Sequence, residues 1–78
     1  MARTVSQIAQ EILVDWRNVS PAAAPYLNAM RSLDSIDDSY IHDSGRSIVR
    51  YFLANAAPWR GEVARRVKAE LKGLLGER

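Results

Sequence analysis

The stretch TVSQIAQEILVDWRNV, residues 4–19, decides the fold class of this chain. Its apolar side chains recur every three or four residues, the spacing that lines them up along one face of an α-helix. These side chains are Val5, Ile8, Ala9, Ile12, Leu13 and Trp16. Thr4 and Gln7, three residues apart, match the capping box that fixes a helix start. The pattern predicts an amphipathic helix over about residues 5–18.

The next segment, VSPAAAPYLNAMRSL (residues 19–33), predicts a second helix with two alternative starts. Ser20 suits the N-cap position, and Pro21 suits the first helical position. Pro25 has no N–H to bond back to Pro21, so the helix either kinks at Pro25 or begins there. From Tyr26 onward the apolar stripe is regular.

Two further segments have the helical period. SGRSIVRYFLAN (residues 44–55) predicts a third helix with Asp43 as its N-cap. Its apolar positions are Ile48, Val49, Phe52, Leu53 and Ala56. APWRGEVARRVKAELKGLLGER (residues 57–78) predicts a fourth helix, with Pro58 in its first turn and Gly76 at its end. No segment alternates with the period of two that half-buried strands show.

These segments predict an all-α fold: a compact small bundle of three long helices plus one short helical turn. The chain has 78 residues, which suits a single helical domain over residues 1–78. An apolar content of 47% is too high for a disordered chain. The side chains of Trp16, Phe52, Trp59 and Met30 fall on the apolar stripes, so we expect them in the core.

The stretch DSIDDSYIHDSG, residues 34–45, contains four aspartates and the only histidine of the chain. It lacks the glycine at position six and the glutamate at position twelve of a calcium-binding EF-hand loop. One histidine beside an aspartate is too few ligands for a transition metal. His42, Asp43 and Ser44 are adjacent in sequence, whereas the members of a catalytic triad meet through the fold.

A joint between two helices accounts for the same stretch. Ser35 and Asp38 have capping-box spacing, which predicts a single helical turn over residues 36–41. Asp43 would then cap the third helix, and Arg46 and Arg50 could reach these aspartates. A loosely held cation is the alternative interpretation of the carboxylates.

The charges are divided unevenly along the chain. Residues 1–43 contain six acidic and three basic side chains, whereas residues 44–78 contain eight basic and three acidic ones. This division could orient the domain on an anionic partner, or one half could neutralise the other. On the fourth predicted helix, Glu62, Arg66 and Glu70 share one row and are expected to pair among themselves.

A second row on this helix contains only cations, which makes it the best nucleic-acid candidate of the chain. The candidate contacts with nucleic acid or another partner are Arg60, Arg65, Lys68 and Lys72. An ordinary solvated face is the alternative. A helix-turn-helix motif is not expected, because Pro58 would fall inside its first helix and Gly61 in the first turn of the fourth predicted helix.

Several classes of function are not expected from the sequence. The chain has no cysteine, so a disulfide, a thiolate metal site and a cysteine nucleophile are excluded. Neither an apolar leader nor a membrane-spanning stretch is visible, which favours a cytoplasmic protein without membrane contact. No nucleophile–base pair stands out, and a useful pocket is hard to build at this size. We therefore expect neither an enzyme, nor a cofactor or metal site, nor a small-molecule substrate.

Three blocks, PYLNAMRSL (residues 25–33), DSGRSIVRYFLANA (43–56) and WRGEVARRVKAEL (59–71), carry a resemblance. Together they resemble a group of small helical proteins, without an assigned activity, that bacterial phages and integrated mobile elements encode. The resemblance implies an accessory protein of a bacterial cytosol. The expected function is a small non-enzymatic protein-interaction module, whose partner is another protein or a second copy. The alternative is a weakly sequence-specific nucleic-acid-binding protein that uses the basic face of the C-terminal helix.

Overall fold

Four helices and a short β-ladder make up the secondary structure in the computed structural model, which describes residues 3–40 and 43–76. The elements are α1 (Val5–Asp15), α2 (Ala24–Met30), β1 (Ser39–Tyr40), β2 (Asp43–Ser44), α3 (Gly45–Ala54) and α4 (Glu62–Leu75). The chain is mostly helical, as predicted. The helices are 11, 7, 10 and 14 residues long, and the ladder stands where a short helical turn was expected.

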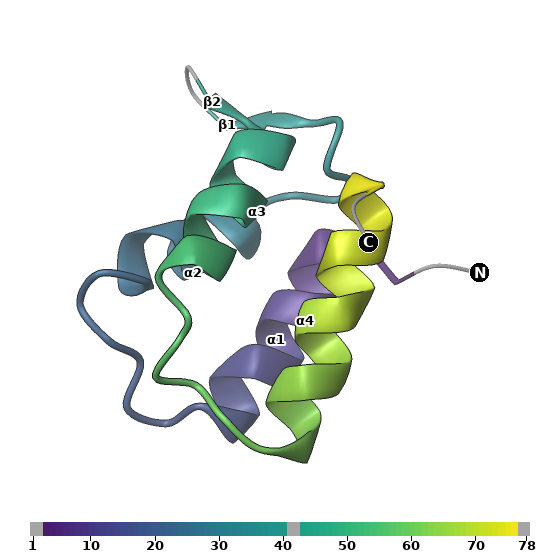
Figure 1. Ribbon diagram of the computed structural model, residues 1–78. Helices are drawn as coiled ribbons and strands as arrows, with labels where there is room; N and C mark the ends of the chain where they lie inside the picture. The colour runs from purple at the N-terminus through teal and green to yellow at the C-terminus, as the bar shows by residue number, and fades with distance from the viewer. Residues whose placement is uncertain (1–2, 41–42, 77–78) are drawn as a thin grey trace.

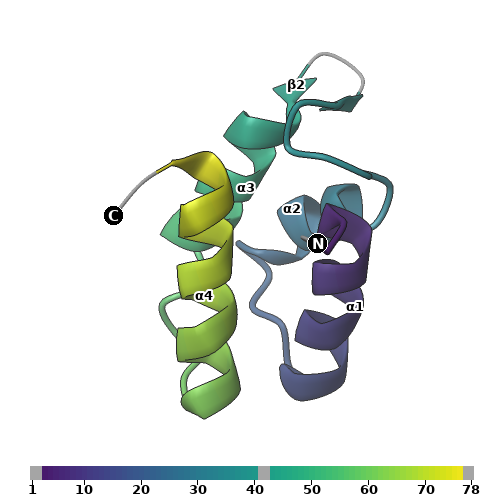
Figure 2. The same cartoon turned by 90° about the vertical axis from the view of Figure 1, so that its right-hand side faces the viewer.

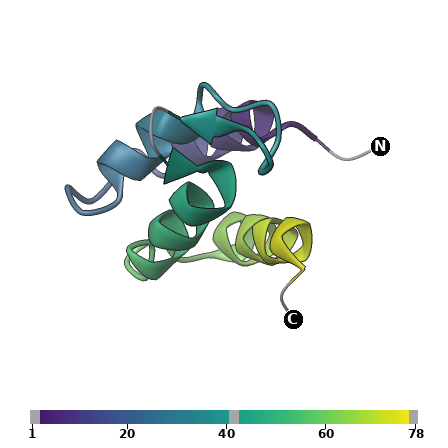
Figure 3. The ribbon, with the colours of Figure 1, turned by 90° about the horizontal axis from the view of Figure 1, so that it is seen from above.

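The helices form a ring in which each one packs against two neighbours (Figure 1). Helices α1 and α4 lie side by side and run in opposite directions (Figure 2). Seen from above, α1 and α2 form one layer, and α3 and α4 form the other (Figure 3). The apolar stripes of all four helices therefore face a common interior.

The start of α1 confirms the predicted capping box. The Gln7 amide donates to the Thr4 hydroxyl at 3.1 Å, and the Thr4 amide donates to the Gln7 side chain at 2.8 Å. The helix ends at Asp15, three residues before the expected end at 18. The backbone of Trp16 leaves the helical conformation, with φ −96° and ψ 86°, and its ring enters the core.

The position of Pro25 is compatible with the observed start of α2. The helix begins at Ala24, so Pro25 lies in the first turn, where a missing N–H removes no helical hydrogen bond. Ser20 is not its N-cap, which corrects the prediction. The Ser20 carbonyl instead accepts from the amides of Ala23 and Ala24, both at 3.0 Å, and forms a separate turn before the helix.

The predicted helical turn over residues 36–41 is wrong. The Asp38 carboxylate accepts from the amides of Asp34 and Ser35, at 3.0 and 3.1 Å, and so closes a tight turn. The chain then extends into β1, which pairs with β2 in antiparallel register. Ile41, which was expected in the helical turn, lies outside the described residues.

The N-cap of α3 is Ser44 rather than Asp43. The Ser44 hydroxyl accepts from the Ser47 amide at 3.1 Å, whereas Asp43 lies in β2 opposite Tyr40. Gly45 makes this junction tight, because its amide donates to the Asp38 carbonyl at 2.6 Å. A Cβ at Gly45 would lie only 2.7 Å from the carbonyl oxygen of Ile36. The ladder and α3 can therefore join without a spacer only because residue 45 is glycine.

Helix α4 begins later than predicted, because Gly61 is its N-cap and adopts a φ of +113°. Pro58 thus lies in the connection before the helix, not in its first turn. Gly61 also lies in this connection, so its expected place inside the helix is wrong. The connection runs over residues 55–61 and is longer than the turn of about three or four residues in a helix-turn-helix motif. Gly76 ends α4 in the left-handed region, as predicted, with φ +78°.

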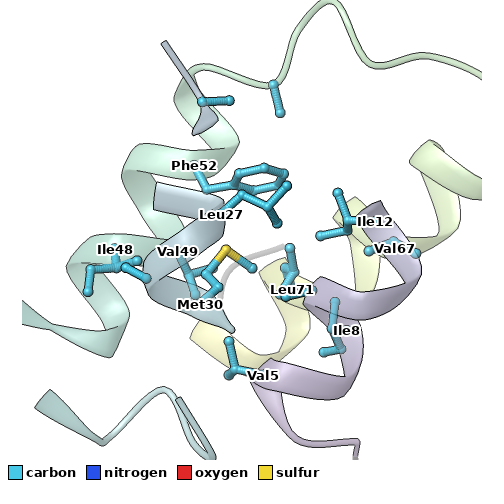
Figure 4. Packing of buried hydrophobic residues seen from close by; sticks show 14 of the residues in the cluster. Val5, Ile8, Ile12, Leu27, Met30, Ile48, Val49, Phe52, Val67 and Leu71 are labelled. Carbon is cyan, nitrogen blue, oxygen red and sulfur yellow. The ribbon is translucent and has the colours of Figure 1, made fainter. Parts of the chain in front are cut away.

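The core contains the apolar side chains that the helical stripes predict (Figure 4). Phe52 and Met30 are fully buried. Trp16 and Trp59 stack with their ring centroids 5.8 Å apart, and Phe52 meets both rings edge-on. The predicted burial of these three aromatic rings is confirmed. Together they join α1 and α3 to the connection before α4.

Candidate functional site

The basic side chains of α4 divide into two sets with different environments. On the flank that faces α1, Arg66 forms an ion pair with Glu11. Arg3 bridges the same carboxylate, at 2.6 Å, to Glu70 of α4, at 2.5 Å. The two arginines lower the pKa of Glu11, Arg66 having the larger effect and Arg3 the smaller. The predicted pairing of Arg66 within its own helix is therefore wrong, because antiparallel α1 offers closer partners.

The other flank of α4 brings the four sequence-predicted cations together. Arg60, Arg65 and Lys68 line a shallow hollow of about 430 Å³ at the N-terminal end of the helix. The remaining wall of this hollow consists of Ala57, Trp59, Gly61 and Ala64. Lys72 lies one turn further along α4, close enough to lower the pKa of Lys68. No acidic side chain of the described residues lines the hollow.

Lys68 plays a structural part that its sequence pattern did not reveal. Its ammonium donates to the carbonyl oxygens of Ala56 and Trp59, both at 2.7 Å, and lies 5.8 Å from the centroid of the Trp59 ring. Its pKa is lowered, mainly by burial and then by the charges of Lys72 and Arg60. Lys68 therefore fastens the 55–61 connection to α4 and is committed to contacts inside the molecule.

The other three cations are exposed, and we call them the basic face: Arg60, Arg65 and Lys72. Across residues 3–40 and 43–76, no ion pair or hydrogen bond engages these three side chains. On α4, Ala69 is an exposed small residue between Arg65 and Lys72, and the exposed Gly73 directly follows Lys72. The basic face is consequently smooth, cationic and open to an anion.

A contact between distant residues holds the base of this face in place. The Trp59 indole donates to the Asp15 carboxylate at the end of α1, at 2.8 Å. The sequence pattern placed Trp59 in the core but gave no sign of this bond, because the two residues are 44 positions apart. Arg60 follows directly, so its backbone is anchored by the buried ring of its neighbour.

The aspartate-rich stretch lies away from the basic face, beside the C-terminal end of α4. Arg46 pairs with Asp37 at 3.3 Å and donates to the Leu75 carbonyl at 3.4 Å, so the predicted reach of Arg46 toward these aspartates is confirmed. In the part of the chain that the structure describes, no three histidine, aspartate or glutamate side chains gather as metal ligands. His42, on which the transition-metal and triad interpretations depend, lies outside the described residues.

Comparisons of the chain with protein-family models, with curated proteins and with solved structures found no match. Within the described residues, no helix has the length and apolar character needed to cross a bilayer. The basic face is therefore interpreted from its own geometry and charge.

Proposed function

We propose that this protein is a small non-enzymatic accessory module that acts by binding an anionic macromolecule through the basic face of α4. The observation that carries this proposal is that some cations of the chain are paired with carboxylates and those of the basic face are not. Arg3, Arg46 and Arg66 are each paired with a carboxylate of the chain. The three side chains of the basic face have no such partner among the described residues, although Arg65 and Lys72 lie on the same helix as the paired Arg66.

Grouping unpaired cations favours an anionic partner for a physical reason. Like charges at neighbouring positions of a helix repel one another, and a negatively charged surface relieves that repulsion on contact. The pKa of Lys68 is lowered mainly by burial and to a lesser extent by the charges of Lys72 and Arg60, so these cations are close enough to repel one another.

The described surface offers little to other modes of action. The only large apolar side chains exposed among the described residues are Val14 and Tyr51, which lie on different helices. Self-association through an apolar face, which the sequence left open, therefore has less support than binding through charge. The resemblance to proteins of phages and mobile elements supports a cytoplasmic setting, where the partner would be a host or phage macromolecule.

Affinity capture from a bacterial lysate tests this proposal, with half of each sample treated with nuclease. The baits are the wild-type chain, the double variant Arg65→Gln/Lys72→Gln, and the charge-matched control Arg17→Gln/Arg31→Gln, which changes exposed arginines outside α4. We expect an anionic partner on the wild-type and control baits, and its loss from the Arg65→Gln/Lys72→Gln bait. Equal capture by all three baits would overturn the proposal.

A further inference from the structure

We infer that the anionic partner is the phosphate backbone of duplex nucleic acid, bound with little dependence on base sequence. This inference rests on the proposed function, because it names the partner of the same basic face. Four features of α4 and its surroundings lead to it: the absence of an apolar anchor, the absence of a stacking ring, the spacing of the cations and the absence of side chains that read adenine.

The first feature separates nucleic acid from an acidic protein. Protein–protein interfaces usually centre on a large apolar or aromatic anchor. Beside Arg65 and Lys72, the small residues Ala69 and Gly73 are exposed on α4. Trp59, the ring nearest to these cations, is 2% exposed. A face made of cations and small side chains suits a partner that presents charge without an apolar pocket.

The second feature separates a duplex from a single strand. Proteins that bind single strands stack successive bases on exposed aromatic rings. Here the Trp59 ring is covered by Trp16 on one side and contacted by the Lys68 ammonium. The tyrosine pair of α2 and α3 lies elsewhere: Tyr51 is exposed, and Tyr26 beside it is half-buried. Splayed bases would therefore find no ring on the basic face.

The third feature is the spacing of the charges along the helix. Arg65 and Lys72 are seven residues apart in α4, which corresponds to about 10.5 Å at about 1.5 Å per residue. Successive phosphates of one strand advance by about 3.4 Å along the duplex axis, so the two cations span about three steps. Ala69 between them and Gly73 next to Lys72 are small and let the strand approach closely. Arg60 extends the row beyond the start of the helix, and the guanidinium of either arginine can hold a phosphate with two hydrogen bonds.

The fourth feature concerns sequence recognition. Adenine is read mainly by asparagine or glutamine, and serine and threonine supply further contacts to base edges. Helix α4, with the sequence EVARRVKAELKGLL, contains none of these four residue types. Phosphate contacts fix position and orientation but carry no sequence information. Arginine and lysine can also read guanine, so the weak dependence on base sequence rests on the missing adenine-reading side chains, and charge and duplex shape should contribute most to binding.

Fluorescence anisotropy with the purified full chain tests the inference. The probes are two labelled duplexes of unrelated sequence and one single strand of the same length, with polyglutamate as an acidic-polypeptide competitor. Three phosphate contacts predict a slope of about −2.7 for log affinity against log salt, or about a 40-fold loss between about 50 and about 200 mM. Arg60→Gln, Arg65→Gln and Lys72→Gln should each reduce the loss to about 12-fold, because one contact is removed. Arg31→Gln, which changes an exposed arginine at the end of α2, should keep the wild-type slope.

Each outcome of this experiment supports the inference, overturns the inference alone, or overturns both proposals. Equal binding of both duplexes, stronger than that of the single strand and with the expected slopes, supports the inference. Preference for the single strand, or tight binding of polyglutamate with no binding of duplex, overturns the inference and leaves the proposed function standing. Failure to bind any of these polyanions at low salt, or binding that the three substitutions leave unchanged, overturns both. Circular dichroism of each variant confirms that the fold is intact.

Discussion

Replacing Trp59 with alanine should come close to unfolding this domain. The side chain is 2% exposed, stacks on Trp16 at a centroid distance of 5.8 Å, and meets Phe52 at 6.5 Å. Removing a buried tryptophan side chain costs about 3–5 kcal/mol of stability. At about 0.05–0.15 kcal/mol per residue, a chain of 78 residues has about 4–12 kcal/mol in total. The substitution therefore removes a large share of the free energy of unfolding.

A milder substitution separates the ring from its hydrogen bond. Trp59→Phe keeps an aromatic side chain in the core but removes the indole N–H that donates to Asp15 at 2.8 Å. A lost hydrogen bond and a smaller ring together should cost about 1–3 kcal/mol. This variant should remain folded, so its stability can be measured even where that of Trp59→Ala cannot.

Urea denaturation followed by far-ultraviolet circular dichroism measures both effects. Val14→Ala is the control, because Val14 is 75% exposed and its loss should change stability by about 0.5 kcal/mol or less. If the free energy of unfolding of Trp59→Ala lay within about 0.5 kcal/mol of the wild-type value, the buried and stacked Trp59 ring would not stabilise the core as described.

Three further predictions concern residues at other places in the fold. Gly45→Ala should destabilise the domain by more than about 1 kcal/mol in the same urea assay, because the new Cβ would lie 2.7 Å from the Ile36 carbonyl oxygen. An unchanged midpoint of urea unfolding would contradict the tight junction. Lys68→Gln should cost about 1–3 kcal/mol yet leave the salt slope of nucleic-acid binding unchanged, whereas a reduced slope would make Lys68 a direct contact. The pKa of Glu11 is lowered in the fold by Arg66, so its ion pairs stabilise the protein above the ordinary pKa and are lost as pH falls through the folded value. Thermal melting from neutral to acidic pH should show this loss for the wild type, and Glu11→Gln should show less of it.

The helices that could be predicted from the sequence are those with strong local signals. The start of α1 is set by Thr4 and Gln7, which lie three residues apart and need no tertiary partner. The end of α4 is likewise set by Gly76, a residue that tolerates the left-handed conformation. The burial of Phe52 could be assigned because the helical period places it on an apolar stripe; the same period predicted the burial of Trp59, although this residue lies in the connection before α4.

The errors arise where distant groups compete with local propensity. Ser35 and Asp38 do form part of a capping pattern, but the chain after Asp38 pairs with β2 instead of continuing as a helix. At α4, Gly61 adopts a positive φ that no sequence period reports, and the helix start moves past Pro58. Glycine in a helical pattern is compatible with an N-cap as well as with the first turn, so this choice depended on the packing of residues 55–61.

The sequence predicted which cations lie together in the candidate site but not what each of them does. Arg60, Arg65, Lys68 and Lys72 do lie together, as their spacing indicated. The spacing could not show that Lys68 donates to the Ala56 and Trp59 carbonyls. The path of the 55–61 connection brings these acceptors to Lys68, and that path is not encoded in the helical period. A lysine that follows a helix–helix connection by one or two turns is a candidate for the same internal role.

The network of Arg3, Glu11, Arg66 and Glu70 gives α4 two unlike flanks. Opposite charges cancel on the flank beside α1, while the other flank keeps its positive potential. A small domain with charge on one side experiences a torque in the field of a polyanion and turns that side forward before the surfaces touch. The internal ion pairs would thus contribute to the rate and direction of encounter, even though none of them would touch the partner.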